Sequence, residues 1–269
     1  MADLEFTEEL WTLAAKARRW VVKVGTSVLT DTAQLRVTRQ RVERVADEVA
    51  ALRQCGKEVI LVTSGAIGIG MGVLDLDSRP KELAKLQAAA ATGQGKLMQW
   101  YAGRMEENKL HVAQVLLTRG DLEDHQRRAN VKATLETLLK AGVVPIINEN
   151  DTVSTEEIRY GDNDLLSAHV AALIGADLLI LLTDVDQIIG PEGPLGLVKK
   201  KITPYLERAA RGTDKESSTG GVRTKFEAAR ITMAHGIPMA VMNGRDRANL
   251  VGLAAGGGKQ QIKGTWFIP

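Results

Sequence analysis

The sequence predicts an α/β protein with a mainly parallel sheet covered by helices on both faces. Short apolar runs rich in branched residues alternate with longer segments of helical periodicity, the order typical of this class. The runs are apolar throughout, as expected for strands buried on both faces of a parallel sheet. The chain has 269 residues, enough for a sizeable core, and shows no strong linker and no repeat of solenoid period.

Composition excludes several other classes of protein. The formal net charge is +2, and the basic runs 127–128 and 199–201 are short and lack interleaved aromatic residues, so we expect no nucleic-acid partner. A single cysteine, Cys55, rules out an intrachain disulfide and fits a reducing compartment. The four histidines lie far apart in the sequence, and this spacing predicts no zinc site.

The first residues are acidic and contain no unbroken apolar segment, so they do not predict a signal peptide. No apolar run approaches the length of a membrane span. We therefore expect a cytoplasmic protein without a membrane partner.

Taken in order, the N-terminal half begins with an added helix, because Leu10, Leu13, Ala14 and Ala17 share one helical face. Branched apolar runs predict the strands, and apolar residues at helical spacing predict the helices. The predicted elements after residue 19 are a strand at 20–24, a helix around 42–52 that Gly56 ends, a strand at 59–62, a helical region at 83–108 interrupted near Gly93 and Gly95, a strand at 111–117 and a helix at 130–141.

The C-terminal half continues the alternation of strands and helices. Two polar segments, 187–201 and 211–221, predict a loop and a linker-like stretch. The predicted elements are a strand at 143–147, a helix at 165–174, a strand at 178–182, a helix that opens at 219–225 and runs to His235, a strand at 238–242, a turn at 256–258 and an edge strand or hairpin at 262–267.

Polar side chains follow two of these buried strands. The strand at 143–147 ends on Asn148-Glu149-Asn150-Asp151, and the strand at 178–182 ends on Thr183-Asp184. Between them, Gly161-Asp162-Asn163-Asp164 opens a helix. Asp and Asn are common in turns and helix caps. However, Asp151, Asp162, Asp164 and Asp184 at one sheet edge would repel one another, so the pattern predicts cations there: a metal, a substrate amine or lysines.

Glycine-rich corners follow strands or precede helices at Gly25, at 65–72 and at Gly220-Gly221. Such corners present backbone N–H groups to an anion, although structural glycines are the commoner case. The sequence contains neither a P-loop motif nor the glycine spacing of dinucleotide folds, and Ser64 lacks the flanks of a hydrolase nucleophile.

Two lysines distinguish the corners. Lys23 ends a strand before a glycine turn, and Lys225 opens a helix after one. Backbone donors, ammonium groups and acidic residues are what phosphoryl transfer needs. The alternatives are a snorkelling lysine at position 23 and an exposed helix residue at position 225.

Six blocks of this sequence, in order and spacing, resemble the glutamate 5-kinase family of the amino-acid kinase superfamily. The match as a whole covers nearly the whole chain from Trp20 to Phe267. The blocks are residues 22–27, 62–67, 148–151, 161–164, 182–184 and 219–225.

The resemblance implies a three-layer α/β/α sandwich with a mainly parallel central sheet, the amino-acid kinase fold. The implied kinase domain spans residues 20–269, with an amino-acid-binding lobe at about 20–177 and a nucleotide-binding lobe at 178–269. Residues 1–19 are then an N-terminal extension, and no C-terminal RNA-modification-type module is expected.

The implied activity is ATP-dependent phosphorylation of the side-chain carboxylate of L-glutamate, the first step of proline biosynthesis. Carried over by position, Lys23 and Lys225 stabilise the transferring phosphoryl group and Asp164 holds the two lysines. The family also implies Mg²⁺, with no dedicated protein ligands for a metal, feedback inhibition by L-proline, and a homo-oligomer, a dimer or tetramer. Glutamate would bind Ser64, Asp151 and Asn163, with Asn148 and Asp162 nearby, and ATP would bind Lys23, Thr183, Asp184, Thr219, Gly220, Gly221, Val222, Arg223, Thr224 and Lys225.

The side-chain chemistry agrees with this assignment. Asp151 and Asp162 suit an ammonium group, and Ser64 and the amides of Asn148 and Asn163 suit carboxylate oxygens. A carboxylate acceptor is already deprotonated, so the reaction requires no general base.

The sequence departs from the family after Asp184, where Val185-Asp186-Gln187 replaces the usual Gly-Leu-Tyr. Two alternatives stay open: a kinase of the same fold acting on another small carboxylate or phosphate acceptor, and a non-catalytic amino-acid or nucleotide sensor.

Overall fold

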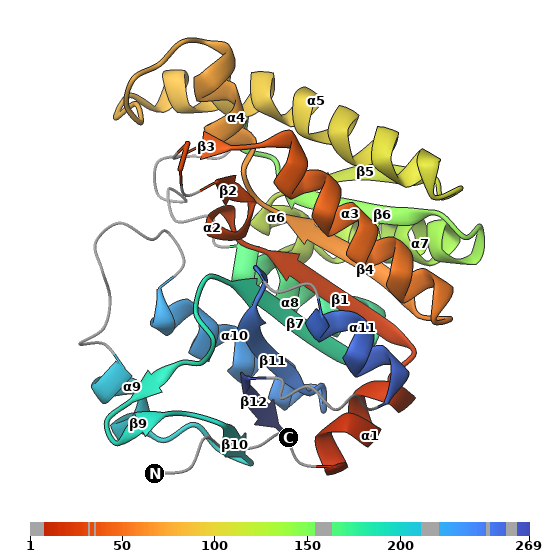
Figure 1. Ribbon diagram of the computed structural model, residues 1–269, viewed down its shortest axis with the longest axis vertical. Coiled ribbons are helices and arrows are strands. Elements are labelled where there is room, and N and C mark those ends of the chain that lie inside the picture. The colour runs from red at the N-terminus through yellow and green to blue at the C-terminus, as the bar shows by residue number, and fades with distance from the viewer. Residues whose placement is uncertain are drawn as a thin grey trace.

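The structure is a computed structural model that describes residues 8–31, 33–34, 36–153, 163–210, 221–245, 248–256 and 263–269. Its central element is an eight-stranded sheet in the order β10-β12-β11-β7-β1-β4-β6-β5 (Figure 1). All neighbouring strands run parallel except β11 and β12, which are antiparallel. The strands are β1 (Arg19–Val24), β4 (Glu58–Thr63), β5 (Val112–Leu117), β6 (Val144–Glu149), β7 (Leu178–Thr183), β10 (Leu197–Lys199), β11 (Met239–Asn243) and β12 (Gly264–Ile268).

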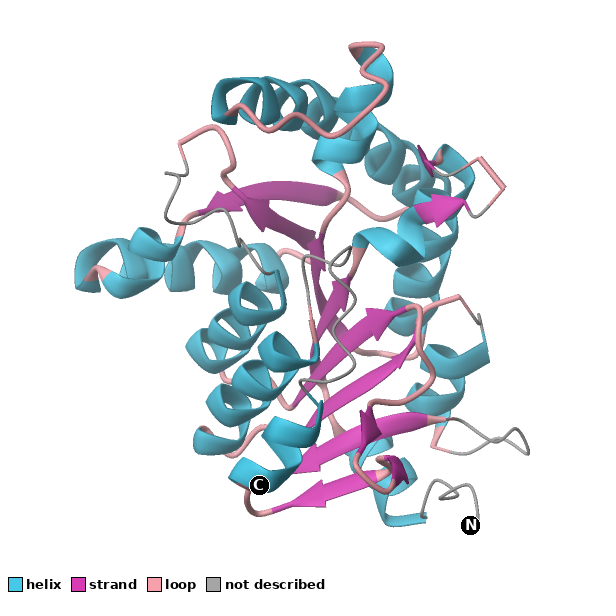
Figure 2. Ribbon diagram, turned by 90° about the vertical axis from the view of Figure 1, so that its left-hand side faces the viewer, coloured by secondary structure: helices cyan, strands magenta, loops and turns pink. Residues whose placement is uncertain are grey.

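Helices cover both faces of this sheet (Figures 1 and 2). Two small hairpins, β2 (Thr30–Asp31) with β3 (Arg36–Val37) and β8 (Ile189–Gly190) with β9 (Gly193–Pro194), lie outside it. The helices are α1 (Glu8–Lys16), α2 (Thr26–Leu29), α3 (Arg39–Gln54), α4 (Ala66–Val73), α5 (Leu83–Glu107), α6 (Arg119–Glu123), α7 (His125–Lys140), α8 (Asn163–Ile174), α9 (Pro204–Ala210), α10 (Val222–Ala234) and α11 (Ala248–Ala255).

Two separate apolar cores follow from the two-residue period of the strands. In β1, Val22 and Val24 face the core formed with α1, α3, α5 and α11, whereas Val21 faces the core formed with α7, α8 and α10. The same alternation places Lys23 on the α8 side of the sheet. The predicted fold class is therefore confirmed, with both faces of the sheet buried.

Several predicted elements differ from the structure. The segment 187–201 is not simply a loop, because it contains β8, β9 and β10, and β10 rather than the last strand forms the sheet edge. Helices α2, α4, α6, α9 and α11 were not predicted. The helix predicted at 130–141 begins earlier, at His125, where the Asp124 side chain accepts a hydrogen bond from the backbone N–H of Arg127.

The N-terminal helix packs on the outside of the fold. Leu10 and Ala14 are buried in the core that α1 shares with α11. The ammonium group of Lys57 lies near the C-terminal end of α1. It donates to Ala17 O at 2.8 Å and lies 5.4 Å from the centre of the Trp20 ring. Burial lowers the pKa of Lys57, so this ammonium depends on the carbonyl groups and the ring around it.

The interruption predicted near Gly93 and Gly95 is wrong, because α5 is continuous from Leu83 to Glu107. Gly93 instead permits close packing: a Cβ atom there would lie 1.8 Å from Ala66 O. On the facing helix, a Cβ atom at Gly70 would lie 1.7 Å from Ala89 O. The two helices therefore touch through their backbones, which brings α5 against the corner that follows β4 (Figure 1).

This packing predicts opposite effects for two neighbouring glycines. Gly93→Ala should destabilise the protein by about 1–3 kcal/mol, because the helices must separate to admit the methyl group. Gly95→Ala, with no atom within 4 Å of its Cβ position, should gain about 0.5–1 kcal/mol through helix propensity. Urea unfolding monitored by circular dichroism measures both changes. Equal effects of the two substitutions would contradict the close approach at Gly93.

Candidate functional site

The candidate site lies at the carboxyl ends of the parallel strands. β1 is flanked by β4 on one side and by β7 on the other, so the order of connection reverses at β1. In open α/β sheets, ligands bind at such a switch point. Lys23 is the second-last residue of β1, and the polar residues Thr63, Asn148 and Thr183 lie at the ends of β4, β6 and β7.

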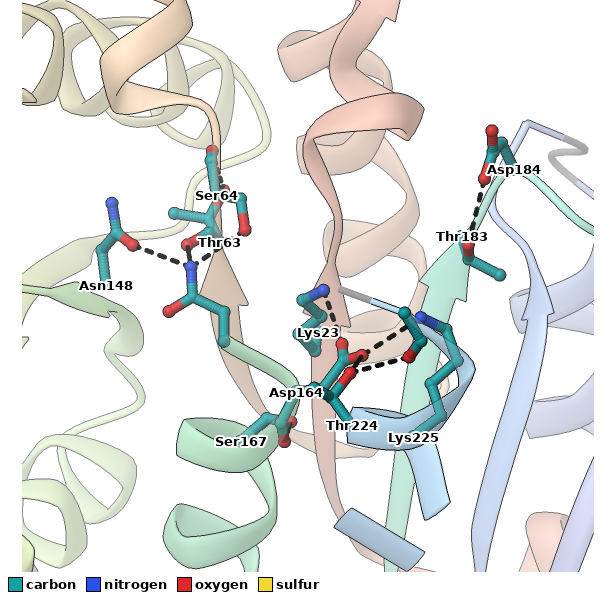
Figure 3. A network of polar contacts seen from close by, with 12 residues as sticks. Lys23, Thr63, Ser64, Asn148, Asp164, Ser167, Thr183, Asp184, Thr224 and Lys225 are labelled. Carbon is teal, nitrogen blue, oxygen red and sulfur yellow. Dashed lines mark hydrogen bonds and ion pairs between the residues drawn. The ribbon is translucent and has the colours of Figure 1, made fainter. Parts of the chain in front are cut away.

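Lys23, Asp164 and Lys225 form one buried ion cluster, as Figure 3 shows. Lys23 Nζ lies 2.6 Å from Asp164 Oδ1, and Lys225 Nζ lies 3.2 Å from Asp164 Oδ2. The three residues come from the end of β1, the first turn of α8 and the first turn of α10. The sequence-predicted lysines and acid are thus brought together by elements from three distant parts of the chain.

The charges of this cluster stabilise one another. Asp164 is fully buried, which by itself would raise its pKa, but the ammonium groups of Lys23 and Lys225 outweigh burial and lower the pKa to about 2. The carboxylate is therefore ionised at neutral pH. Among these three side chains positive charge exceeds negative charge by one, which suits the transfer of a phosphoryl group.

Thr224 belongs to the same cluster. Its hydroxyl group lies 3.3 Å from Asp164 Oδ2 and 2.8 Å from Gly221 O. Gly221 precedes α10 as its N-cap, with no side-chain cap, so the first N–H groups of the helix point out of its end. Arg223 is turned along the helix surface, where it pairs with Glu227 at 3.0 Å.

Beside the ion cluster lies a row of hydrogen-bonded amides. Asn163 Nδ2 donates to Thr63 O at 2.9 Å, and it is also 2.9 Å from Ser64 Oγ and 3.1 Å from Asn148 Oδ1. These three acceptors use both hydrogens of the Asn163 amide. Asn163 therefore offers a ligand its oxygen rather than the N–H expected for a carboxylate, and an oxygen suits an ammonium group.

The row continues to a residue that the sequence did not indicate. Asn148 Nδ2 donates to Oε1 of Gln94, a buried side chain on α5, at 2.9 Å. At the two ends of the row, Gln94 Nε2 and Asn163 Oδ1 are buried and have no hydrogen-bond partner among the residues that the structure describes. The only sequence signal for Gln94 was a polar residue between two glycines in an alanine-rich helix.

The remaining predicted residues lie at the same sheet edge or outside the described ranges. Asp151 follows β6, and burial raises the pKa of its carboxyl group while Arg79 opposes this change. Thr183 ends β7 and Asp184 follows it, with Thr183 Oγ1 3.2 Å from Asp184 Oδ1. Asp162, Thr219 and Gly220 lie outside the described residues.

Among the described residues, no three Asp, Glu, His or Cys side chains gather in a way that could hold a metal ion. No helix among these residues is both long enough and apolar enough to cross a bilayer.

Comparison with known proteins places this geometry in a family. Residues 18–243 match the amino acid kinase family. The chain is 46% identical over 262 residues to a glutamate 5-kinase from Moorella thermoacetica, covering 95% of this chain and 68% of the relative. It is 51% identical over 232 residues to a glutamate 5-kinase from Symbiobacterium thermophilum, covering 84% of this chain and 88% of the relative.

Solved structures share the fold at low sequence identity. A carbamate kinase from Giardia lamblia bound to AMP-PNP superimposes with a TM-score of 0.61 at 17% identity, covering 94% of this chain and 99% of that one. A second structure of the Giardia carbamate kinase gives a TM-score of 0.62 at the same identity and coverage. This likeness confirms the α/β/α architecture.

The ion cluster predicts a distinctive dependence of stability on pH. Asp164→Asn should lower the free energy of unfolding by about 3–5 kcal/mol at pH 7, because two buried ammonium groups lose their shared carboxylate. The folded pKa of Asp164 is below the unfolded value of about 3.9, so its contribution is complete above pH ~4 and is lost as pH falls toward 2. The difference between wild type and variant should therefore shrink on acidification.

Urea unfolding between pH 7 and pH 3 measures this difference. The control is Glu82→Gln, which removes an exposed carboxylate 2.9 Å from Lys85 and should change stability by less than about 1 kcal/mol. A gap between wild type and Asp164→Asn that stays constant down to pH 3 would disprove the linkage.

Proposed function

The chain belongs to the amino acid kinase family, and we propose that it transfers the γ-phosphoryl group of ATP to the side-chain carboxylate of L-glutamate. The product is L-glutamyl 5-phosphate, the first intermediate of proline biosynthesis. Relatives that are 46% and 51% identical carry the name glutamate 5-kinase. The observation that carries the proposal is the buried Lys23–Asp164–Lys225 cluster directly beside the amide row.

The two groups of residues divide the reaction between them. Lys23 and Lys225 stabilise the charge that develops on the transferring phosphoryl group, and Asp164 fixes both ammonium groups before the reaction begins. The acceptor carboxylate of glutamate attacks from the side of the amide row. It is ionised at neutral pH, so it needs no base to remove a proton.

The amino-acid end of glutamate carries an ammonium group and a second carboxylate. Asn163 Oδ1 and the Asp151 carboxylate suit the ammonium group, because both accept hydrogen bonds. The Ser64 hydroxyl group accepts from Asn163 and has its own hydrogen to donate to a carboxylate oxygen. Asn148 has one amide hydrogen beyond the one that it donates to Gln94.

ATP is assigned to the β7 and α10 side of the cluster. Thr183 ends β7 and Asp184 follows it, and the first turn of α10 offers backbone N–H groups to phosphate oxygens together with Lys225. Mg²⁺ is commonly bound by substrate phosphates with one or two carboxylates. Asp184 directly follows β7 and would supply such a carboxylate. The Mg²⁺ ion would neutralise charge on the phosphates of ATP.

Two properties of the assembled enzyme belong to the same proposal. We expect a homo-oligomer and feedback inhibition by L-proline, as the family resemblance implies. Size-exclusion chromatography with light scattering and a proline titration of the activity test them.

The proposed reaction yields an acyl phosphate, which hydroxylamine traps as a coloured hydroxamate. Incubation with ATP, Mg²⁺ and L-glutamate should give γ-glutamyl hydroxamate in proportion to ADP release. A parallel screen with other small carboxylates and with carbamate tests the acceptor. A better acceptor than glutamate would overturn the substrate assignment, and ligand binding without turnover would indicate a sensor.

The proposed roles of the lysines predict their kinetic effects. Lys23→Ala and Lys225→Ala should each lower kcat about 10²–10³-fold, because each removes one prearranged charge from the transferring phosphoryl group. Lys85→Ala, in an exposed ion pair with Glu82, should leave kcat unchanged. Steady-state ADP release and a circular dichroism spectrum of each variant measure activity and folding. A folded Lys225→Ala protein with wild-type kcat would remove that residue from the mechanism.

A further inference from the structure

Helix α5 directs two polar side chains toward the ends of the strands. Gln94 and Tyr101 are seven residues apart, or two helical turns, and therefore share one face of the helix. The Tyr101 hydroxyl group lies 3.0 Å from Thr63 Oγ1, and Gln94 Oε1 accepts from Asn148 Nδ2 at 2.9 Å. The backbone contact at Gly93 brings the neighbouring Gln94 close enough to reach the end of β6.

Backbone groups fix the orientation of every amide in this row. The backbone N–H of Glu149 donates to Asn148 Oδ1 at 2.9 Å, so the Asn148 nitrogen faces Gln94. Because that nitrogen is a donor, Gln94 must present its oxygen to Asn148. Gln94 Nε2 is bonded to the same carbon as Oε1 and therefore lies next to Asn148, with both of its hydrogens available.

This nitrogen has no hydrogen-bond partner in the part of the chain that the structure describes, although Gln94 is only 8% exposed. A buried donor without an acceptor destabilises a protein, so such a group calls for an explanation, and a bound ligand is one. Most other inward positions of this helix are apolar, among them Ala90 and Leu97, and the polar group of buried Tyr101 has Thr63 as its partner. A methionine would fill the same space without that cost.

We propose that Gln94 Nε2 donates a hydrogen bond to the α-carboxylate of the acceptor amino acid. The inference rests on the proposed function, which places the reacting carboxylate at Lys23. From there the substrate extends along the row, past Asn163, to the donors of Asn148 and Gln94. Gln94 is therefore a residue that selects an α-amino dicarboxylate over acceptors with a single carboxylate.

The experiment compares L-glutamate with 4-aminobutyrate, which keeps the amine and the reacting carboxylate but lacks the α-carboxylate. Gln94→Met removes the donor and preserves side-chain length. Gln94→Glu removes the donor but keeps an oxygen to accept from Asn148. Gln99→Met, an exposed glutamine on the same helix, is the matched control. For each protein, KM for L-glutamate and ATP and the inhibition constant of 4-aminobutyrate are measured, and thermal shifts report binding independently of turnover.

We expect Gln94→Met to raise KM for L-glutamate about 10- to 100-fold, the effect of losing a hydrogen bond to a charged group. The inhibition constant of 4-aminobutyrate and KM for ATP should change less than about 3-fold. Gln94→Glu should weaken the binding of L-glutamate at least as much as Gln94→Met, because the new carboxylate then lies beside the α-carboxylate of the substrate. The proposal is overturned if Gln94→Met weakens the binding of L-glutamate and of 4-aminobutyrate equally. It is also overturned if Gln94→Glu has the wild-type KM for L-glutamate.

Failure of this inference is distinguishable from failure of the proposed function. Thermal stabilisation of the wild type by L-glutamate without hydroxamate formation would overturn the proposed kinase reaction. The Gln94 inference would then stand if Gln94→Met lost the stabilisation by L-glutamate but kept that by 4-aminobutyrate. It would fall if the variant lost both to the same extent. A wild type that neither binds nor phosphorylates L-glutamate overturns both.

Discussion

The sharing of one buried carboxylate by two ammonium groups is the constraint on which the rest of the structure depends. A buried Asp164 would be strongly unfavourable without cations, and two buried lysines would be unfavourable without an anion. The cluster therefore fixes three elements together: β1 must present Lys23 on its α8 face, α8 must begin at the strand ends, and α10 must begin beside it. The parallel sheet, whose strand ends meet at one edge, is the architecture that satisfies this requirement.

The amide row complements the ion cluster by a different kind of interaction. In the proposed reaction, the cluster stabilises developing charge on the reacting atoms through strong electrostatic interactions. The row consists of neutral side chains whose donors and acceptors have fixed directions, because Thr63 O and the N–H of Glu149 determine them. Fixed direction gives selectivity for the shape of a small substrate, whereas charge alone attracts any anion. Asn163 and Asp164, adjacent in sequence, join the two systems at the start of α8.

Sequence alone predicted the features that follow from periodicity and chemistry. The apolar strands β1, β4, β6, β7 and β11 were recognisable because each is buried on both faces. Lys23 and Asp164 were recognisable because charges beside buried strands need partners, whereas Lys225, on a helix, was assigned through the family resemblance. The short strands within 187–201 were not recognisable, since they are rich in glycine, proline and lysine and owe their conformation to tertiary pairing.

The close packing of α4 against α5 was also not predicted from the sequence. Gly93 was interpreted as a helix breaker, because propensity counts its flexibility and cannot show that Ala66 O lies where a side chain would be. Gln94 was missed for the related reason that its partner, Asn148, lies 54 residues away. Contacts between residues so far apart depend on topology, which local patterns specify only indirectly.

The order of the cluster along the chain also bears on how the protein folds. Lys225 is 61 residues beyond Asp164 in sequence, and Lys23 lies on a strand that pairs with both β4 and β7. Pairing of such distant segments is slow, because large loops must close before any stabilisation is gained. During synthesis, α10 leaves the ribosome after most of the sheet. In the proposed mechanism the centre is therefore completed late in synthesis, and a nascent chain that lacks α10 holds the charged pair Lys23 and Asp164 without the second lysine.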